Sequence, residues 1–329
     1  MTPELVCPAG TPAGLRTAVD AGAHAVYCGY RDETNARNFP GLNFDRGEMQ
    51  DGIAYAHAKG ARVFVAINTF MRAGATAMWK RAVDDAVAAK ADALILADAA
   101  LVAHAHEAYP AQRLHLSVQA AAATPEAIAF YRERFAIKRV VLPRVLTVEE
   151  VARLTAAARP CETEVFVFGG LCVMAEGRCL LSSYATGKSP NMNGVCSPPS
   201  HVAYNEDEAG ALTAALGGFT IERFAPGEPA GYPTLCKGRF CAQGETSHLF
   251  EDPVSLNAMA LLPKLAEAGV AAFKIEGRQR GRAYVASVVR TFREALDAMD
   301  AGRAPDPAAL EALMEGGRDT AGAYRKAWR

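Results

Sequence analysis

The sequence lacks an excess of charge of either sign, and it has no apolar run long enough to cross a membrane. Its 329 residues include 35 lysines and arginines and 36 aspartates and glutamates, which give a net charge of −1. A near-neutral chain has no general attraction to nucleic-acid phosphates, and a membrane span needs about 20 consecutive apolar residues. The composition therefore argues against a nucleic-acid ligand and against a membrane-spanning protein.

Several familiar catalytic motifs are also missing. No GxGxxG follows the first predicted strand, which argues against a dinucleotide site, and there is no GxSxG turn of a serine hydrolase. The seven histidines form no HxxxH or HExxH pair, so we assign none of them to a metal. The first residues, MTPELVCPAG, do not resemble a secretory signal, and we expect a cytoplasmic protein. Because cytoplasmic thiols stay reduced, the eight cysteines are expected to be ligands or core residues.

Short apolar runs alternate with amphipathic stretches, which predicts a parallel sheet with crossover helices. The predicted strands are Leu5–Cys7, Ala25–Cys28, Arg62–Ile67, Ala93–Leu96, Leu114–Val118, Arg139–Leu142, Glu164–Phe168 and Ala272–Ile275. Eight strands with eight helices favour a closed (β/α)8 barrel of the TIM-barrel type over an open doubly wound sheet. We expect the barrel to span residues 1–301, with an insertion at 170–250, a helix at 253–268 and a tail at 302–329.

The stretch EVFVFGGLCVMAEGRCLLSSYATGKSPNMNGVC, which begins at Glu164, interrupts this alternation. It contains Cys172, Cys179 and Cys196, and Cys236 in TLCKGRF is a plausible fourth member of the set. Four thiolates can hold zinc or an iron–sulfur cluster. The paired CxxC knuckles of a zinc ribbon are absent, and wide spacing suits a cluster held by several loops. Two alternatives stay open: four inert buried thiols, or Cys241 as the fourth ligand.

The residues around these cysteines carry a resemblance. Glu164-x-Phe166-x-x-Gly169, followed by Leu171-Cys172, Gly177-x-Cys179 and Leu181-Ser182, resembles the signature of the collagenase-like peptidase family, unassigned peptidase family thirty-two. Gly170 stands where that signature usually has Ser or Ala. The segments LVCPAG, TNARNFPGLNF, AINTF, ADALILAD, VVLPRVL, AGYPTLCKGRF and FKIEGRQR resemble one subgroup of the family, which acts in ubiquinone biosynthesis.

The resemblance implies a 4Fe-4S cluster on Cys172, Cys179, Cys196 and Cys236. It further implies a subunit of an oxygen-independent hydroxylase that acts on ubiquinone precursors as a heterodimer with a paralogue, UbiV, and uses prephenate as the oxygen donor. Three alternatives remain: a relative that hydroxylates RNA bases, a collagenase-like protease, and a scaffold whose cluster only stabilises the fold. We expect a partner to contact apolar residues that the barrel does not fully cover, namely Phe219, Ile221, Phe224, Leu235 and the segment Tyr324–Trp328.

Polar residues follow the predicted strands, and chemistry in (β/α)8 barrels gathers at the C-terminal strand ends. The catalytic candidates are Asp98, Gln119 and Glu276. The substrate-binding candidates are Arg37, Asn68, Arg144, Lys274 and Arg278, because a dianion such as prephenate needs cations and arginine binds carboxylates bidentately.

Each candidate also has a structural interpretation. Asp98 could cap a helix, Arg144 could form a structural ion pair, and Glu276 could pair with Arg278 at a rim. Asn68 and Gln119 could satisfy backbone groups. Among the remaining cysteines, Cys7 and Cys28 are expected to line the barrel and Cys161 to be inert.

Overall fold

A closed barrel of eight parallel strands forms the centre of the described part of the chain, which comprises residues 2–39, 41–171, 179–188, 196–228, 230–252, 254–314 and 318–325 of a computed structural model. The strands are β1 (Glu4–Pro8), β2 (Ala25–Cys28), β3 (Arg62–Ile67), β4 (Ala93–Leu96), β5 (Leu114–Leu116), β6 (Arg139–Val141), β7 (Glu162–Gly170) and β14 (Ala272–Ile275). Strand β14 pairs in parallel with both β1 and β7 and closes the barrel. The predicted (β/α)8 fold is confirmed.

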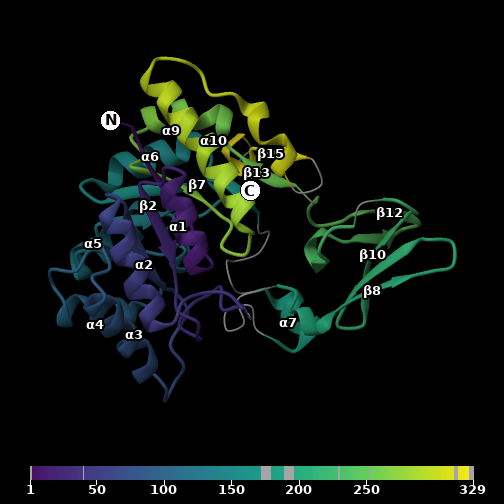
Figure 1. Cartoon of the computed structure of the whole chain (residues 1–329), viewed down its shortest axis with the longest axis horizontal. Helices are drawn as coiled ribbons and strands as arrows, with labels where there is room; N and C mark the ends of the chain where they lie inside the picture. The colour runs from purple at the N-terminus through teal and green to yellow at the C-terminus, as the bar shows by residue number, and fades with distance from the viewer. Residues whose placement is uncertain are drawn as a thin grey trace.

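Helices surround the barrel (Figure 1). They are α1 (Pro12–Asp20), α2 (Arg46–Ala58), α3 (Ala77–Ala88), α4 (Ala99–Ala108), α5 (Pro125–Phe135), α6 (Val148–Ala158), α9 (Leu262–Glu267) and α10 (Arg282–Asp300). Capping boxes begin α2 at Asp45 and α6 at Thr147, because each cap side chain and a Glu three residues later satisfy each other's backbone N–H. No described helix is long and apolar enough to cross a membrane.

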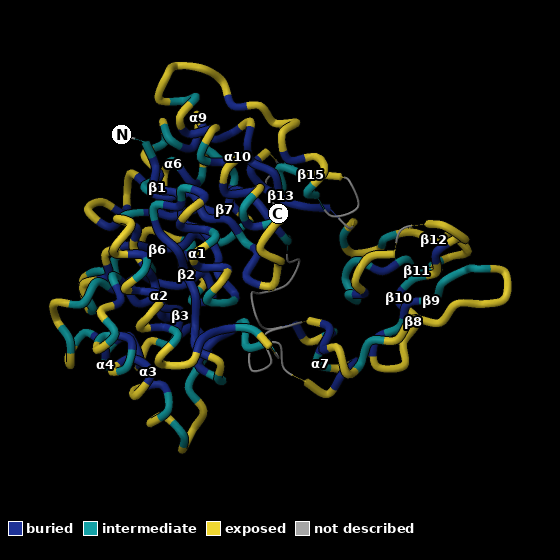
Figure 2. Tube along the Cα trace, viewed as in Figure 1, coloured by how far each residue is buried: buried dark blue, intermediate teal, exposed yellow. Residues whose placement is uncertain are grey.

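The buried apolar residues form two layers, one on each face of the barrel sheet. Figure 2 shows the buried residues concentrated in the barrel. The smaller layer fills the barrel interior and includes Tyr27, Phe64 and Ile95. The larger layer lies between strands and helices and contains Cys7 and Cys28. Cys28 Sγ lies 3.5 Å from Met49 Sδ of α2, so this thiol faces the helices. The prediction that Cys7 and Cys28 line the barrel interior is therefore wrong. Burial raises the pKa of Cys28 to about 12 and that of Cys161 to about 11, which makes both unreactive.

The expected insertion forms a segment beside the barrel (Figure 1). It contains α7 (Leu180–Thr186), the antiparallel strands β8 (Val202–Glu206), β9 (Leu212–Leu216) and β10 (Phe219–Phe224), and the hairpin of β11 (Arg239–Ala242) and β12 (Glu245–His248). Ile221 and Phe224 are buried within it and Leu235 is half-buried, which corrects the expectation that all four apolar residues are available to a partner. Phe219 remains 45% exposed.

The chain after the insertion differs from the prediction in two places. Part of the expected helix at 253–268 forms β13 (Ser255–Asn257), because β7 extends to Gly170 and offers an unpaired backbone edge to which β13 adds antiparallel. Strand β15 (Asp319–Thr320) then pairs with β13. Tyr324 is buried, and its hydroxyl donates to Phe166 O at 2.6 Å, so the described part of the tail packs against the barrel. Trp328 lies outside the described residues.

Candidate functional site

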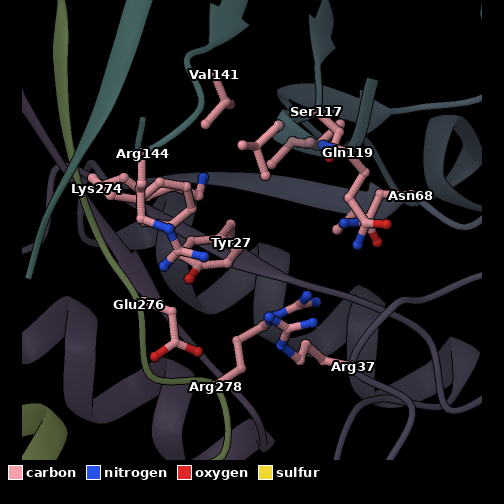
Figure 3. Close-up of a pocket in the computed structure, with 14 residues that line it drawn as sticks. Tyr27, Arg37, Asn68, Ser117, Gln119, Val141, Arg144, Lys274, Glu276 and Arg278 are labelled. Carbon is pink, nitrogen blue, oxygen red and sulfur yellow. Dashed lines mark hydrogen bonds between the residues drawn. The ribbon is translucent and has the colours of Figure 1, made fainter. Parts of the chain in front are cut away.

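One cavity lies at the C-terminal ends of the barrel strands, and seven of the eight predicted catalytic and substrate-binding residues line it. Its empty volume is about 500 Å³ when the space open to solvent is included. Figure 3 shows Arg144 and Lys274 on one side of this cavity and Gln119 and Asn68 on the other. The seven residues are Arg37, Asn68, Gln119, Arg144, Lys274, Glu276 and Arg278. The barrel topology therefore brings these residues, which are distant in sequence, to one place.

Asp98 does not line this cavity. Its Oδ1 accepts from Ala100 N and Leu101 N at 2.9 and 3.1 Å at the start of α4, and its Oδ2 accepts from Met71 N at 3.1 Å. Both carboxylate oxygens are thus occupied by backbone donors. The geometry corresponds to the capping alternative, and it gives Asp98 no position next to a ligand in the cavity.

Lys274 is anchored in the barrel by a buried ionic network. Its Nζ donates to Glu164 Oε1 at 2.5 Å, and Arg139 Nη1 donates to Glu164 Oε2 at 3.1 Å. Glu164 is fully buried. Burial lowers the pKa of Lys274, and the neighbouring Glu164 carboxylate opposes that effect. Lys274 Nζ also lies 3.9 Å from the ring centroid of Tyr27. The ammonium is therefore held at a fixed place with its charge largely balanced by Glu164.

Arg278 is buried with 6% exposure. Its Nη1 donates to Asn35 Oδ1 at 2.8 Å, and its guanidinium carbon lies 5.4 Å from the centroid of Tyr27. Burial lowers the pKa of Arg278 to about 10. The side chain thus stays cationic at neutral pH, although no carboxylate is its hydrogen-bond partner among the contacts described for it. A buried cation of this kind can bind an anion strongly.

Arg144 and Glu276 are joined through the end of β7. Arg144 Nη1 donates to Gly170 O at 2.5 Å, and Gly170 N donates to Glu276 Oε2 at 3.2 Å. The Arg144 guanidinium also covers the ring of Phe166, 4.5 Å from its centroid. Burial opposes the ionisation of Glu276, but the charges of Arg37 and Arg144 outweigh it and lower its pKa. Glu276 and Arg278 have separate partners, so the predicted rim pair does not describe their contacts.

Glycine is required beside this carboxylate. Gly169 has φ +119°, and a Cβ at this residue would lie 2.7 Å from the backbone O and the Cβ of Glu276. Gly10 approaches the neighbouring loop still more closely, since a Cβ there would lie 1.8 Å from Arg278 O. These close backbone contacts fix where Glu276 and Arg278 enter the cavity.

Two amides form the neutral side of the cavity. Asn68 Oδ1 accepts from Ala36 N at 3.1 Å, which ties the end of β3 to the loop at 29–44. Gln119 lies in the short helix η1 (Val118–Ala120), and its backbone N donates to Ser117 Oγ at 3.3 Å. Asn68 and Gln119 are both buried. Asn68 thus satisfies a backbone group, as its structural interpretation predicts.

The cysteines assigned to the cluster lie partly outside the described residues. Cys172 is among the residues not described. Cys179 caps the N-terminus of α7, where its Sγ accepts from Ser182 N at 3.4 Å, and the hydroxyl of Ser182 donates to Cys196 O. The helix η3 (Leu235–Lys237), which carries Cys236, packs against α7.

Cysteine thiolates are suitable ligands for a soft metal centre such as an iron–sulfur cluster. Backbone N–H donation to a cysteine sulfur is among the contacts that tune iron–sulfur clusters, and Ser182 supplies it to Cys179. Among the described cysteines of the predicted set, Cys179 caps α7, the backbone of Cys196 is bonded to Ser182 of α7, and Cys236 lies in η3 beside α7, whereas Cys241 is exposed on β11. Within the described residues no group of three or more ligating side chains is assembled as a metal site.

Asn35 is a residue of the site that the sequence did not single out. Its Oδ1 accepts from both Arg278 Nη1 and Arg37 N, at 2.8 and 3.0 Å, and its Nδ2 donates to Tyr30 O at 3.1 Å. The side chain is fully buried. The available signal was the unusual length of the loop at 29–44, since long loops in compact domains are often functional. Asn35 therefore positions two of the candidate cations.

Replacing Asn35 by alanine is expected to lower the free energy of unfolding by about 1–3 kcal/mol, because the buried Arg278 guanidinium loses an acceptor. Urea unfolding followed by circular dichroism measures this change. Asn38→Ala is the matched control, since Asn38 lies in the same loop and is half-buried. Equal stability of the two variants would contradict the positioning role of Asn35.

The chain is similar to a known protein family, to characterised and uncharacterised relatives, and to a solved structure. A family model described as Peptidase family U32 matches residues 10–324. The tRNA hydroxylation protein P of Escherichia coli is 33% identical over 328 residues, with 94% of this chain and 71% of that protein covered. An uncharacterized protease of Methanocaldococcus jannaschii is 32% identical over 303 residues, with coverages of 90% and 65%. A solved U32 peptidase structure is 20% identical, covers 51% of this chain and 69% of its own, and has a TM-score of 0.41.

Proposed function

Because the chain belongs to peptidase family U32, we propose that it is the iron–sulfur subunit of an oxygen-independent hydroxylase in ubiquinone biosynthesis, as in the UbiU subgroup. The observation that carries the proposal is the cavity, in which Arg37, Arg144, Lys274 and Arg278 face a single described carboxylate, that of Glu276. The E. coli relative is named for hydroxylation, which supports a hydroxylase-type role for this chain.

The charge of the cavity favours a small dianion. Glu164 balances Lys274, and Glu276 lies near Arg37 and Arg144, so the cavity keeps an excess of positive charge. Prephenate carries two carboxylates, and arginine side chains bind carboxylates in a bidentate manner. In the proposed role, Arg278 and Arg144 bind the two carboxylates, and Glu276 is the group that can accept or hold a proton beside the ligand.

Cys172, Cys179, Cys196 and Cys236 would hold the 4Fe-4S cluster. The cluster supplies one-electron redox chemistry when bound. The contacts of α7 with the segments that carry Cys179, Cys196 and Cys236 support this ligand set. The chain's own residues bind the ligand in the barrel, orient its carboxylates and keep Glu276 ionised.

A paralogous subunit, UbiV, is the proposed partner, and the insertion offers a surface for it. Leu180 and Tyr184 of α7 are 80% and 83% exposed, and the ring of Tyr184 lies 6.0 Å from that of Phe219. Exposed apolar groups of this kind are typical of protein interfaces. The hydroxylated ubiquinone precursor would bind in the complex.

RNA-base hydroxylation is the second candidate, because the E. coli relative is named for tRNA. The near-neutral charge of the chain gives it no general attraction for RNA. The protease interpretation has less support, although the Methanocaldococcus relative is named a protease. No histidine or cysteine is among the described residues that line the cavity, so the base–nucleophile pair of a thiol protease is not found there.

A deletion strain tests the proposal. Without oxygen, cells that lack this chain are expected to accumulate unhydroxylated ubiquinone precursors and to keep normal tRNA hydroxylation, both measured by mass spectrometry. Cells grown with oxygen serve as the control. Normal quinones together with loss of a hydroxylated RNA base would contradict the ubiquinone role and support the RNA candidate.

A further inference from the structure

Gln119 contributes a buried acceptor that has no partner. Its Oε1 makes no hydrogen bond to any described residue, and the side chain is only 6% exposed. A buried polar atom left without a hydrogen bond costs about 1–3 kcal/mol, so such atoms call for an explanation. Other described side chains contain unpaired buried atoms, but Gln119 alone among them lines the cavity.

The local fold holds Gln119 in place. Ser117 N donates to Leu96 O at 2.7 Å, which fixes the end of β5 to β4, and Ser117 Oγ accepts from Gln119 N. The short helix η1 then ends at Ala121 in the left-handed conformation, with φ 53°. The amide is therefore carried by an anchored turn and is present before any ligand binds, which is the property of a recognition group.

Gln119 also lies apart from two of the cations, Arg144 and Lys274. Figure 3 shows it on the side of the cavity opposite Arg144 and Lys274, next to the label of Ser117. A ligand whose carboxylates bind the arginines would thus present its other end to Gln119. Carboxylate oxygens are acceptors only and cannot satisfy an amide oxygen, so the group that reaches Oε1 must carry a hydrogen.

We infer that Gln119 selects ligands that carry a hydroxyl group at the end remote from their carboxylates. The inference rests on the proposed function, in which the cavity binds a dicarboxylate, and it narrows the ligand class to hydroxylated dicarboxylates. A site built to hydrogen-bond a hydroxyl discriminates strongly against the analogue that lacks it, because the buried acceptor is then left unpaired. Gln119 is in this sense a specificity-determining residue.

Titration calorimetry with prephenate and with its analogue that lacks the ring hydroxyl tests the inference. The wild-type protein is expected to bind prephenate about 10-fold more tightly than the deoxy analogue. In Gln119→Leu the preference is expected to disappear, because affinity for prephenate falls while affinity for the analogue stays the same or rises. Gln112→Leu, which removes a glutamine whose amide donates to Ala91 O outside the cavity, is expected to keep the wild-type preference.

The possible outcomes separate the two proposals. Equal affinities of the wild-type protein for both compounds, as expected if a water molecule satisfies Oε1, would overturn the role of Gln119 and leave the dicarboxylate site intact. Binding of neither compound would overturn the proposed ligand class itself, and the inference with it. If Gln119→Leu is unstable, Gln119→Glu gives a second test. Its added negative charge should lower the affinity for both compounds, and the preference for the hydroxylated compound should remain because an acceptor remains.

Discussion

Replacement of Arg278 by alanine is expected to weaken prephenate binding about 30-fold or more, the largest effect of any single change in the cavity. Removing one partner of a buried charged hydrogen bond costs about 2–5 kcal/mol, and about 1.4 kcal/mol corresponds to a factor of ten in affinity. Arg278 meets this condition because it is buried, positioned by Asn35 and still cationic at neutral pH. Titration calorimetry of the purified protein measures the change.

Arg144→Ala is expected to have a similar but smaller effect, since Arg144 is only half-buried. Arg278→Lys should recover a small part of the binding, because an ammonium keeps the charge but loses the bidentate geometry. Arg290→Ala is the matched control, as Arg290 is exposed on the outer face of α10. Iron content should be the same in all four variants. Wild-type affinity in both Arg278→Ala and Arg144→Ala would remove these residues from the site.

The site could be predicted to the extent that it follows from topology. A closed parallel barrel brings the C-terminal ends of all its strands to one mouth, so residues just beyond β3, β5 and β14 meet there whatever their distance in sequence. Asn68, Gln119 and Glu276 were found in this way. Asp98 follows the same rule but begins α4 directly, and a carboxylate at that position is held by the first backbone N–H groups of the helix. The rule locates a residue and does not fix where its side chain points.

Contacts between segments far apart in the chain could not be predicted. Asn35 matters because Arg278 lies against it, across 243 positions of sequence. No local pattern encodes that contact. The same holds for β13, whose residues were expected to be helical and which forms a strand because β7 offers an open edge. Tyr324 is a third case, since its hydroxyl finds a backbone acceptor in β7. In each case the deciding contact is made with a polar group that is distant in sequence.

The second large effect concerns the four cysteines of the proposed cluster. Anaerobically purified protein is expected to be brown, with about four iron and four sulfide per chain. Changing Cys172, Cys179, Cys196 or Cys236 to alanine should lower iron to less than about one per chain, because a cubane cluster that loses one of its four thiolate ligands is poorly retained. Iron and acid-labile sulfide assays, together with the visible absorption spectrum, measure the loss.

Two controls distinguish ligation from general damage to the fold. Cys161→Ala removes a buried thiol whose raised pKa keeps it protonated, and Cys241→Ala removes an exposed thiol on β11, so both variants should keep their iron. The contacts of Ser182 sharpen the comparison, since they link Cys179 and Cys196 to α7 but do not involve Cys241. If Cys241→Ala loses iron and Cys236→Ala keeps it, the fourth ligand is Cys241. A colourless protein with stoichiometric zinc would contradict the iron–sulfur cluster itself, because zinc can occupy four thiolates but supplies no redox chemistry.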